Sequence, residues 1–211
     1  WADGRFGKAF NCDTKNFVDL GNVGDFDGSH GFSYGSWIKP KGAASGAPLA
    51  RMNNANDFRG YDLHLSGGAV EPHIISKWPT DAIKVSTKQK LKPDTWQHVF
   101  VTYDGSKKAA GVRIYVDGKL WEWDVREDRL GGSIKSKGPF YLGRRNGGSN
   151  YNGLVDGVRV YGRVLAESEV AALAGNDVIT PLLAKAAAQR SADENKVLRA
   201  HFLSSVDEPY K

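Results

Sequence analysis

The stretch Trp-Gln-His-Val-Phe-Val-Thr-Tyr-Asp-Gly at residues 96–105 joins a strand of alternating apolar residues to a glycine-bearing turn. The pattern returns as Val-Arg-Ile-Tyr-Val-Asp-Gly at 112–118 and as Gly-Leu-Val-Asp-Gly-Val-Arg-Val-Tyr at 153–161. Because successive side chains of a strand point to opposite faces, one face of each segment is apolar. The Asp-Gly pairs supply the positive φ that tight hairpins need. The residues predicted to point into a core are Val99, Val101, Tyr103, Val112, Ile114 and Val116.

Short strand-like segments separated by turns continue over residues 1–165. Further strands are expected at 17–20, 32–38, 48–52, 61–65, 70–75 and 140–143. Pro72 lacks a backbone N–H, which places its strand at a sheet edge or on a bulge. Roughly ten or more short strands with such turns are typical of an all-β, two-sheet antiparallel jelly-roll sandwich.

The last part of the chain has a helical pattern instead. Residues 166–174 predict a short helix that ends at a glycine. Thr180 is expected to cap a second helix with Pro181 at its first position. The Ser-Ala-Asp-Glu sequence at 191–194 has the capping-box pattern that opens a third helix. Its apolar residues are expected to pack on the sandwich, and contact with sequence outside this chain is the alternative.

Length and composition limit the class of protein. The 211 residues suffice for one large β-domain, predicted at 1–175, followed at 176–211 by a helical tail or a linker to a following domain. The single cysteine, Cys12, excludes an intrachain disulfide framework, and no apolar run approaches the length of about 18 residues that spans a membrane. The net charge of +5 is scattered along the chain, whereas nucleic-acid binders concentrate their basic residues. The start at Trp1, without an initiator Met or a signal peptide, suggests a piece of a longer protein.

Five segments, in this order, resemble the concanavalin A-like, laminin G-like jelly-roll modules. They lie at 7–20, 32–40, 96–104, 112–119 and 153–165. Gly60-Tyr-Asp-Leu-His-Leu, Leu142-Gly-Arg-Arg and Leu198-Arg-Ala-His-Phe-Leu are similar to one subgroup, embedded in large planctomycete proteins with cytochrome c-like domains. The resemblance covers residues 5–174 and implies an extracytoplasmic module, periplasmic or at the cell surface, that binds glycans. A strand that usually precedes Trp1 in the family is absent from this chain.

The same alternation selects the residues of a binding face. If the apolar residues point inward, the residues that point outward are Asp62, His64, Glu71, His73, His98, Thr102, Arg113 and Tyr115. They are expected to line the concave sheet, where folds of this kind hold sugars, although an ordinary solvated face is the alternative. Sugar hydroxyls need planar polar groups, and the C–H face of a sugar needs an aromatic ring, for which Trp78 is the predicted platform. The predicted carbohydrate-binding residues are Trp78, His64, His73, Arg59, Asp62 and Tyr115.

Asp156 breaks the apolar pattern. It shares the parity of the inward Val158, so its carboxylate is expected to point into the core, where it needs a cationic partner. That partner is either an arginine, Arg51 or Arg144, or a metal ion. Similar modules hold a structural calcium ion near this position, and the resemblance implies such an ion on Asp156 with Asp13 as a second ligand. No other cofactor is expected.

Two further chemistries have weaker support. His64, His73 and His98 on neighbouring strands suggest a zinc site, but no short-range ligand spacing accompanies them. Glu122 and Glu127 have the Glu-x-Asp-x-x-Glu spacing of retaining glycosidases that use a related jelly roll. The segment directly follows a Val-Asp-Gly-Lys turn, where laminin G-like modules carry an exposed strand, so a solvated hairpin is the favoured interpretation.

The favoured hypothesis is therefore a noncatalytic recognition module for a glycan or polysaccharide, anionic ones included. A protein-interaction or architectural spacer domain, in contact with neighbouring domains of a longer chain, is the alternative. Arg51, Arg59 and the pair Arg144-Arg145 also suit a phosphate or sulfate group, but arginines that neutralise carboxylates are favoured.

Overall fold

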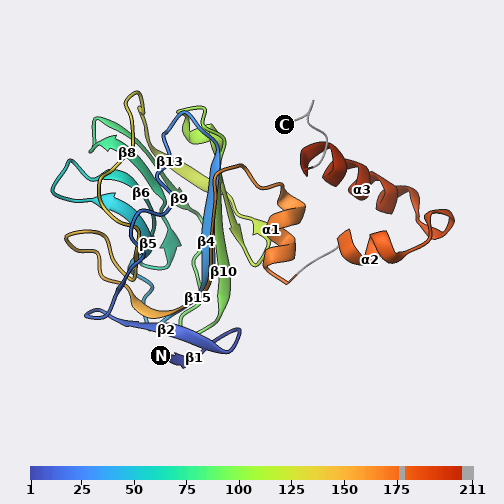
Figure 1. Ribbon diagram of the computed structural model, residues 1–211, viewed down its shortest axis with the longest axis horizontal. Coiled ribbons are helices and arrows are strands. Elements are labelled where there is room, and N and C mark those ends of the chain that lie inside the picture. Colours follow the sequence, from blue (N-terminus) through green and yellow to red (C-terminus); the bar gives the residue numbers. More distant parts are fainter. Residues whose placement is uncertain (176–178, 206–211) are drawn as a thin grey trace.

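The computed structural model describes residues 1–175 and 179–205, and residues 1–161 are built almost entirely from strands and turns (Figure 1). Among these described residues the strands form two antiparallel sheets, one of seven and one of eight strands, packed face to face. This confirms the predicted jelly-roll sandwich. No helix of the described part is long and apolar enough to cross a membrane.

Each sheet can be followed from one edge strand to the other. The seven-stranded sheet has the order β1 (Ala2–Asp3), β2 (Lys8–Asp13), β15 (Asn152–Tyr161), β4 (Phe32–Pro40), β10 (Gln97–Tyr103), β11 (Val112–Val116) and β12 (Lys119–Leu120). The eight-stranded sheet has the order β13 (Trp123–Asp128), β9 (Asp81–Thr87), β8 (His73–Lys77), β6 (Arg59–Ser66), β5 (Gly46–Asn53), β14 (Tyr141–Leu142) and β3 (Val18–Asp19), with β7 (Ala69–Val70) paired to β6.

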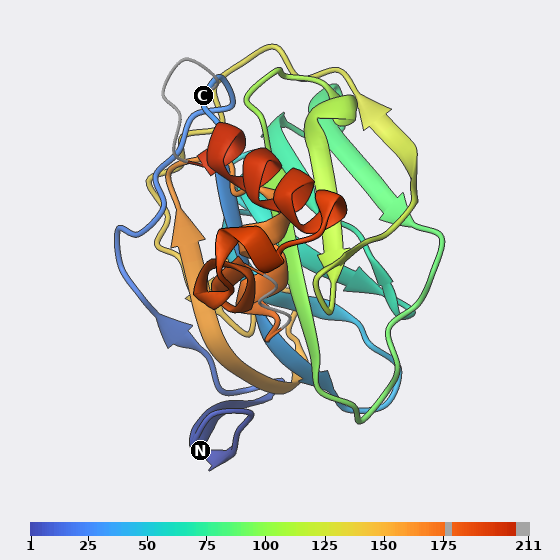
Figure 2. The ribbon, with the colours of Figure 1, turned by 90° about the vertical axis from the view of Figure 1, so that its right-hand side faces the viewer.

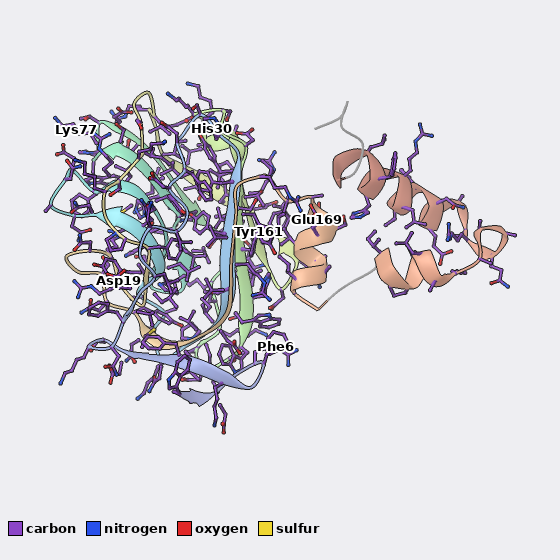
Figure 3. The ribbon with its side chains drawn as sticks, in the orientation of Figure 1. Phe6, Asp19, His30, Lys77, Tyr161 and Glu169 are labelled. Atoms are coloured by element: carbon purple, nitrogen blue, oxygen red, sulfur yellow. The ribbon has the colours of Figure 1, made fainter. Side chains whose placement is uncertain are left out.

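The core lies between the sheets, where side chains fill the space (Figure 3). β10 pairs with β11 so that Val101 lies opposite Ile114, and both are fully buried. Burying such aliphatic side chains stabilises the fold by roughly 1.5–3 kcal/mol each. All six residues predicted to point inward belong to this core: Val99, Val101, Tyr103, Val112, Ile114 and Val116.

Some strands differ from the sequence prediction. The segment predicted as one strand at 70–75 is two strands, β7 and β8, because Pro72 interrupts the backbone pairing between them. The sequence prediction omits β2 and β9, although β9 alternates regularly, with Lys84 and Ser86 between inward residues, and Pro79 marks the turn before it.

The helices lie outside the seven-stranded sheet (Figures 1 and 2). α1 (Glu167–Leu173) packs on the sheet's outer face. Val170 of α1 and Leu165, just before it, contact Phe100 and Tyr115. The helices α2 (Ile179–Ala184) and α3 (Ala192–Ser205) follow, with a 3₁₀ turn (Ala187–Gln189) between them and another (Ala109–Gly111) before β11.

In the tail, one prediction is confirmed and two are not. The capping box is confirmed, because the N–H of Glu194 donates to the Ser191 hydroxyl at 3.2 Å and the N–H of Ser191 donates to the Glu194 carboxylate at 2.7 Å. Thr180, however, lies within α2 rather than before it. The apolar residues of α3 do not all pack on the sandwich, since Val197 and Phe202 are 40% and 51% exposed.

Candidate functional site

The outer face of the eight-stranded sheet carries a row of polar residues across three strands. Asp62 of β6 lies opposite His73 of β8, and His73 lies opposite Lys84 of β9. These residues alternate with core residues, so their side chains leave the core on the same side of the sheet. The row forms one side of a hollow of about 260 Å³. Its lining residues are Phe58, His64, His73, Ile75, Trp78, Lys84 and Arg145.

Asp62 lies beneath the hollow and contacts two of its polar side chains. Its side chain is fully buried and contacts Arg145 Nε at 2.5 Å and His73 Nδ1 at 3.0 Å. Nδ1 of His73 also lies 3.1 Å from the Arg145 guanidinium. Burial by itself would raise the pKa of Asp62, but the charges of Arg145 and His73 outweigh it and hold that pKa well below its ordinary value. Asp62 is therefore an anion that fixes the position of the Arg145 guanidinium.

His64 lies beside this network, two residues along β6 from Asp62. Its ring meets that of His73 edge to face at 5.5 Å, and its Nδ1 is buried with no hydrogen-bond partner among the described residues. Burial lowers the pKa of His64 to about 4. The imidazole is thus neutral at neutral pH, and a neutral imidazole has one donor and one acceptor nitrogen for a hydroxyl group.

Two aromatic side chains stand over the hollow. Trp78 comes from the loop after β8, where its backbone N–H donates to the carbonyl of Asp57 at 2.9 Å, and its ring meets His73 at 5.6 Å. Phe58 comes from the turn before β6 and has a φ of 58°, in the left-handed region. Both rings pack on a small buried cluster that is separate from the main core and consists of Ala47, Ala50, Met52, Ile75 and Ala82. Ile75 of this cluster lines the hollow together with the two rings.

The charged groups around the hollow are paired. Lys84 contacts Glu71 at 2.9 Å, and the Ser86 hydroxyl donates to the same carboxylate at 2.9 Å. Arg145 is paired with Asp62. The site therefore offers directed donors without a strong net charge.

Only part of the predicted carbohydrate-binding set converges at this hollow. Trp78, His64 and His73 line it, and Asp62 lies beneath it. Arg59 has the parity of the core residue Tyr61 and donates to the carbonyl of Ser133 at 2.5 Å, so it does not line the hollow.

The prediction places Tyr115 on the wrong sheet. Tyr115 belongs to β11, on the outer face of the seven-stranded sheet, where α1 covers it. His98 lies on that sheet too, at 1% exposure, where burial lowers its pKa to about 4. The three histidines of the zinc hypothesis therefore do not meet, and no three His, Cys, Asp or Glu side chains in the described part of the chain converge on a metal position.

Sequence reasoning missed the aliphatic Ile75 and three polar or aromatic residues of the hollow. Arg145 was considered only for anions, and Phe58 and Lys84 were not considered for the site. Arg145 lies 83 residues from Asp62, and no local pattern signals such a pairing. Lys84 could have been found from the regular alternation of β9.

Asp156 does not point into the core. A β-bulge between Asp156 and Arg159 inserts an extra residue opposite β4, which reverses the parity before Val158. The Asp156 carboxylate accepts hydrogen bonds from the N–H groups of Phe6 and Gly157, at 2.8 and 2.7 Å.

The calcium hypothesis does not fit this geometry. Asp13 lies opposite Asn152, four residues along β15 from Asp156, which is roughly 13 Å of extended strand. Asp13 instead accepts the N–H groups of Lys15 and Asn16, which lower its pKa. Calcium ligands lie about 2.3–2.6 Å from the ion, so these two carboxylates cannot share one.

The arginines considered as partners of Asp156 bind elsewhere. The buried Arg51 contacts Asp25 at 3.1 Å and donates to Asn22 and to the carbonyls of Val23 and Ser136. Arg144 stacks over Phe17 at 4.7 Å. Arg51 thus neutralises a carboxylate, as favoured, but not the expected one.

Glu122 and Glu127 lie at opposite ends of β13. Glu122 is exposed and contacts Lys88 at 3.2 Å, while Glu127 lies opposite Lys84 and forms an ion pair with Arg129. The strand separates them by roughly 15 Å, whereas retaining glycosidases hold their two carboxyl groups about 5 Å apart. The pair does not have the geometry of that mechanism.

Comparison with known proteins places this fold in a family. Residues 13–171 match the model of the concanavalin A-like lectin/glucanase superfamily. No curated protein matches the sequence. The binding domain of Paraclostridial mosquitocidal protein 1 is similar in structure, with a TM-score of 0.61 and 20% identity over 82% of this chain. The chain spans 44% of that domain.

Two smaller domains are also similar. The CBM40 domain of the Ruminococcus gnavus IT-sialidase, solved with α2,3-sialyllactose, has a TM-score of 0.62 and 16% identity, over 79% of this chain and 96% of its own. Domain 4 of AbnA, an extracellular arabinanase of Geobacillus stearothermophilus, was solved with arabinotriose and has a TM-score of 0.52 and 20% identity, over 82% and 79%.

These structural similarities establish the fold alone, because the sequence identities are 20% or less. The family match is different in kind, since it rests on the sequence and extends over well more than half of the residues. On that match, the chain belongs to the concanavalin A-like lectin/glucanase superfamily.

Proposed function

We propose that the domain is a noncatalytic recognition module that binds a sugar chain in the hollow on the outer face of the eight-stranded sheet. The observation that carries the proposal is the combination of two aromatic walls, Phe58 and Trp78, with hydrogen-bonding groups of His64, Lys84 and Arg145 around one space of about 260 Å³. A sugar ring has an apolar C–H face and a polar rim, and this hollow offers a partner to each.

The polar groups of the hollow are held in place before a ligand arrives. The guanidinium of Arg145 is fixed by Asp62, and the ammonium of Lys84 is fixed by Glu71. Preorganised donors lose less conformational entropy when a ligand binds. Because these cations are paired, neutral sugars are favoured over strongly anionic ones at this position.

A noncatalytic role is supported by the placement of the acidic side chains. Asp62 is buried beneath the hollow and paired with Arg145, and Glu71 is paired with Lys84. Neither carboxylate is placed to act as a free acid or base towards a bound sugar, and Glu122 and Glu127 lie apart.

The proposal extends to the partner of the domain and to its location. Two of the similar domains were solved with a bound sugar, which supports a glycan as the partner. An extracytoplasmic location fits that role, within a longer parent chain such as the planctomycete proteins with cytochrome c-like domains.

Affinity electrophoresis tests the proposal. The domain is run through native gels that contain neutral, uronate-bearing or sulfated polysaccharides, each at two salt concentrations. At least one neutral polysaccharide should retard the wild type, with little effect of salt. Trp78→Ala should weaken that binding roughly tenfold or more, because a central aromatic anchor contributes most of the affinity of such a site.

Trp1→Ala is the matched control, because Trp1 is 85% exposed and meets Phe10, in a different part of the molecule. It should bind as the wild type does. If no polysaccharide retards the wild type, the spacer alternative is correct. If binding disappears with salt and survives Trp78→Ala, the scattered Lys and Arg side chains are responsible and the hollow is not the site.

A further inference from the structure

A second hollow, of about 440 Å³, lies on the outer face of the other sheet. Its lining residues are Arg5, Trp37, Thr95, Trp96, Asp117 and Ala174, none of which lines the first hollow. Trp37 belongs to the seven-stranded sheet, and Ala174 directly follows α1, which covers that sheet. Phe6, beside this hollow, lies on the same side of the sandwich as α1, and Lys77 lies on the opposite side (Figure 3).

The bulge at Asp156 builds one wall of this second hollow. The Asp156 carboxylate binds the N–H of Phe6, and the N–H of Gly4 donates to the carbonyl of Gly7 at 2.9 Å, which closes a turn around Arg5. The turn lays the Arg5 guanidinium over the Trp37 ring at 4.8 Å, and Phe6 meets the same ring edge to face at 6.1 Å.

This arrangement leaves the Arg5 guanidinium ready for a ligand. The Trp37 ring is 7% exposed, and its Nε1 donor is buried without a partner in the described part of the chain. Arg5 is exposed. The indole fixes the plane of its guanidinium, while the five N–H donors of that group point away along its edges.

The opposite wall supplies a carboxylate and an aromatic ring. Asp117, in the turn between β11 and β12, accepts the N–H of His98 at 2.8 Å and donates its own N–H to the His98 carbonyl at 2.8 Å. These two bonds anchor the turn to β10. Trp96, half-buried immediately before β10, presents its ring to the same space.

We propose that this second hollow is a further binding site, for a neutral sugar ring of a polysaccharide. Trp96 stacks on the C–H face of the ring, and the planar guanidinium of Arg5 binds neighbouring hydroxyls in pairs. Asp117 places a carboxylate on the same hollow, which disfavours an anionic ligand there. Trp37 is a positioning residue, because it orients Arg5.

The two sites face away from each other on one rigid sandwich. A single domain therefore binds two segments of polysaccharide, and a branched or folded chain that reaches both gains avidity without any new contact. The second site is separate from the first and binds its ligand whether or not the first hollow binds one.

The experiment compares Trp96→Ala and Arg5→Gln with Trp78→Ala and with the double variants Trp78→Ala/Trp96→Ala and Trp78→Ala/Arg5→Gln. Binding to the polysaccharides named above is measured by affinity electrophoresis, and stoichiometry by calorimetry with soluble oligosaccharides of the best ligand. The controls are Trp1→Ala and Arg126→Gln, which remove an exposed indole and an exposed guanidinium elsewhere. Thermal midpoints confirm that every variant is folded.

The wild type should bind two oligosaccharides per domain, and Trp78→Ala and Trp96→Ala one each. Within the Trp78→Ala background, Arg5→Gln should weaken the remaining binding roughly tenfold, and Trp78→Ala/Trp96→Ala should lose binding.

If Trp96→Ala and Arg5→Gln bind like the wild type while Trp78→Ala abolishes binding, the second site does not exist and the first stands. If Trp78→Ala has no effect while Trp96→Ala abolishes binding, the first site fails and the second stands. If the site takes only sulfated or uronate chains, or an aromatic compound, its assignment to a neutral sugar is wrong.

Discussion

A single buried carboxylate organises the polar side of the first hollow. Asp62 accepts from Arg145 and His73, while its backbone carbonyl accepts the Tyr34 hydroxyl at 2.7 Å from across the core. Asp62 therefore links both sheets to the candidate site. A buried pair of this kind is costly to break, because the remaining partner keeps an uncompensated charge.

Asp62→Asn should lower the free energy of unfolding by about 3–5 kcal/mol at pH 7, since it leaves the Arg145 charge buried without its counterion. The pKa of Asp62 is lower in the folded than in the unfolded chain, so its stabilisation is complete above about pH 5. The stabilisation is lost as the pH falls below the ordinary value of 3.8 toward the folded pKa. Urea unfolding between pH 2 and pH 7 measures this loss, which should be shallower in the variant.

Asp3→Asn is the control for that experiment, because Asp3 is 93% exposed and pairs with the exposed Lys8. Among the described residues Lys8 is its one ion-pair partner, so the substitution should change stability by less than about 1 kcal/mol. Equal effects of the two substitutions would mean that Asp62 does not act as a buried counterion. A loss of stability between pH 6.5 and pH 4 comes instead from protonation of His64 and His98, because their pKa values are lowered to about 4 in the folded chain.

At the scale of single elements, β15 shows how one extra residue redirects a strand. Before the bulge Val155 faces the core and Asp156 faces outward, and after it Val158 and Val160 face the core. Strict alternation from Val158 back to Asp156 therefore gave the wrong face. Gly157 has a φ of 57°, a backbone conformation that glycine adopts readily at a bulge. This glycine was therefore the sequence signal for the bulge.

Asp156→Ala should release the N-terminal turn that holds Arg5 over Trp37. Two backbone N–H groups lose their acceptor, so the free energy of unfolding should fall by about 1–2 kcal/mol. Hydrogen exchange at the Phe6 amide should speed up, and Trp37 should become more accessible to acrylamide quenching. Asp19→Ala is the control, because Asp19 accepts the N–H of Gly21 in a different loop. An unchanged Phe6 exchange rate would show that Asp156 does not anchor this turn.

For the whole molecule, the sandwich and α1 form one packed unit, and the tail adds to it lightly. The outer face of the seven-stranded sheet is covered by Leu165 and Val170. The Ser168 hydroxyl lies 2.8 Å from Nδ1 of His201, which joins α1 to α3. The predicted boundary at 175 lies between these two parts.

A chain that ends at residue 175 should fold with a thermal midpoint within roughly 3 °C of that of the full chain, the shift produced by about 1 kcal/mol in a domain of this size. A chain that ends at residue 163 also loses Leu165 and Val170 and should be destabilised by roughly 3–6 kcal/mol. Calorimetry of the three chains checks both outcomes. If the 175-residue chain melts as low as the 163-residue chain, the tail is part of the domain core.

The sequence by itself determined most of the strands, the inward faces of β10 and β11, and the sandwich, because hydrophobic alternation and turn chemistry are local properties of the chain. It also determined the capping box of α3. It could not tell which sheet an outward residue belongs to, and so His98 and Tyr115 were grouped with His64 and His73. It could not pair Asp62 with Arg145 or detect that a bulge turns Asp156 outward. Those features depend on strand order and on loops that return over long distances, and only the tertiary structure decides which polar groups meet outside the core.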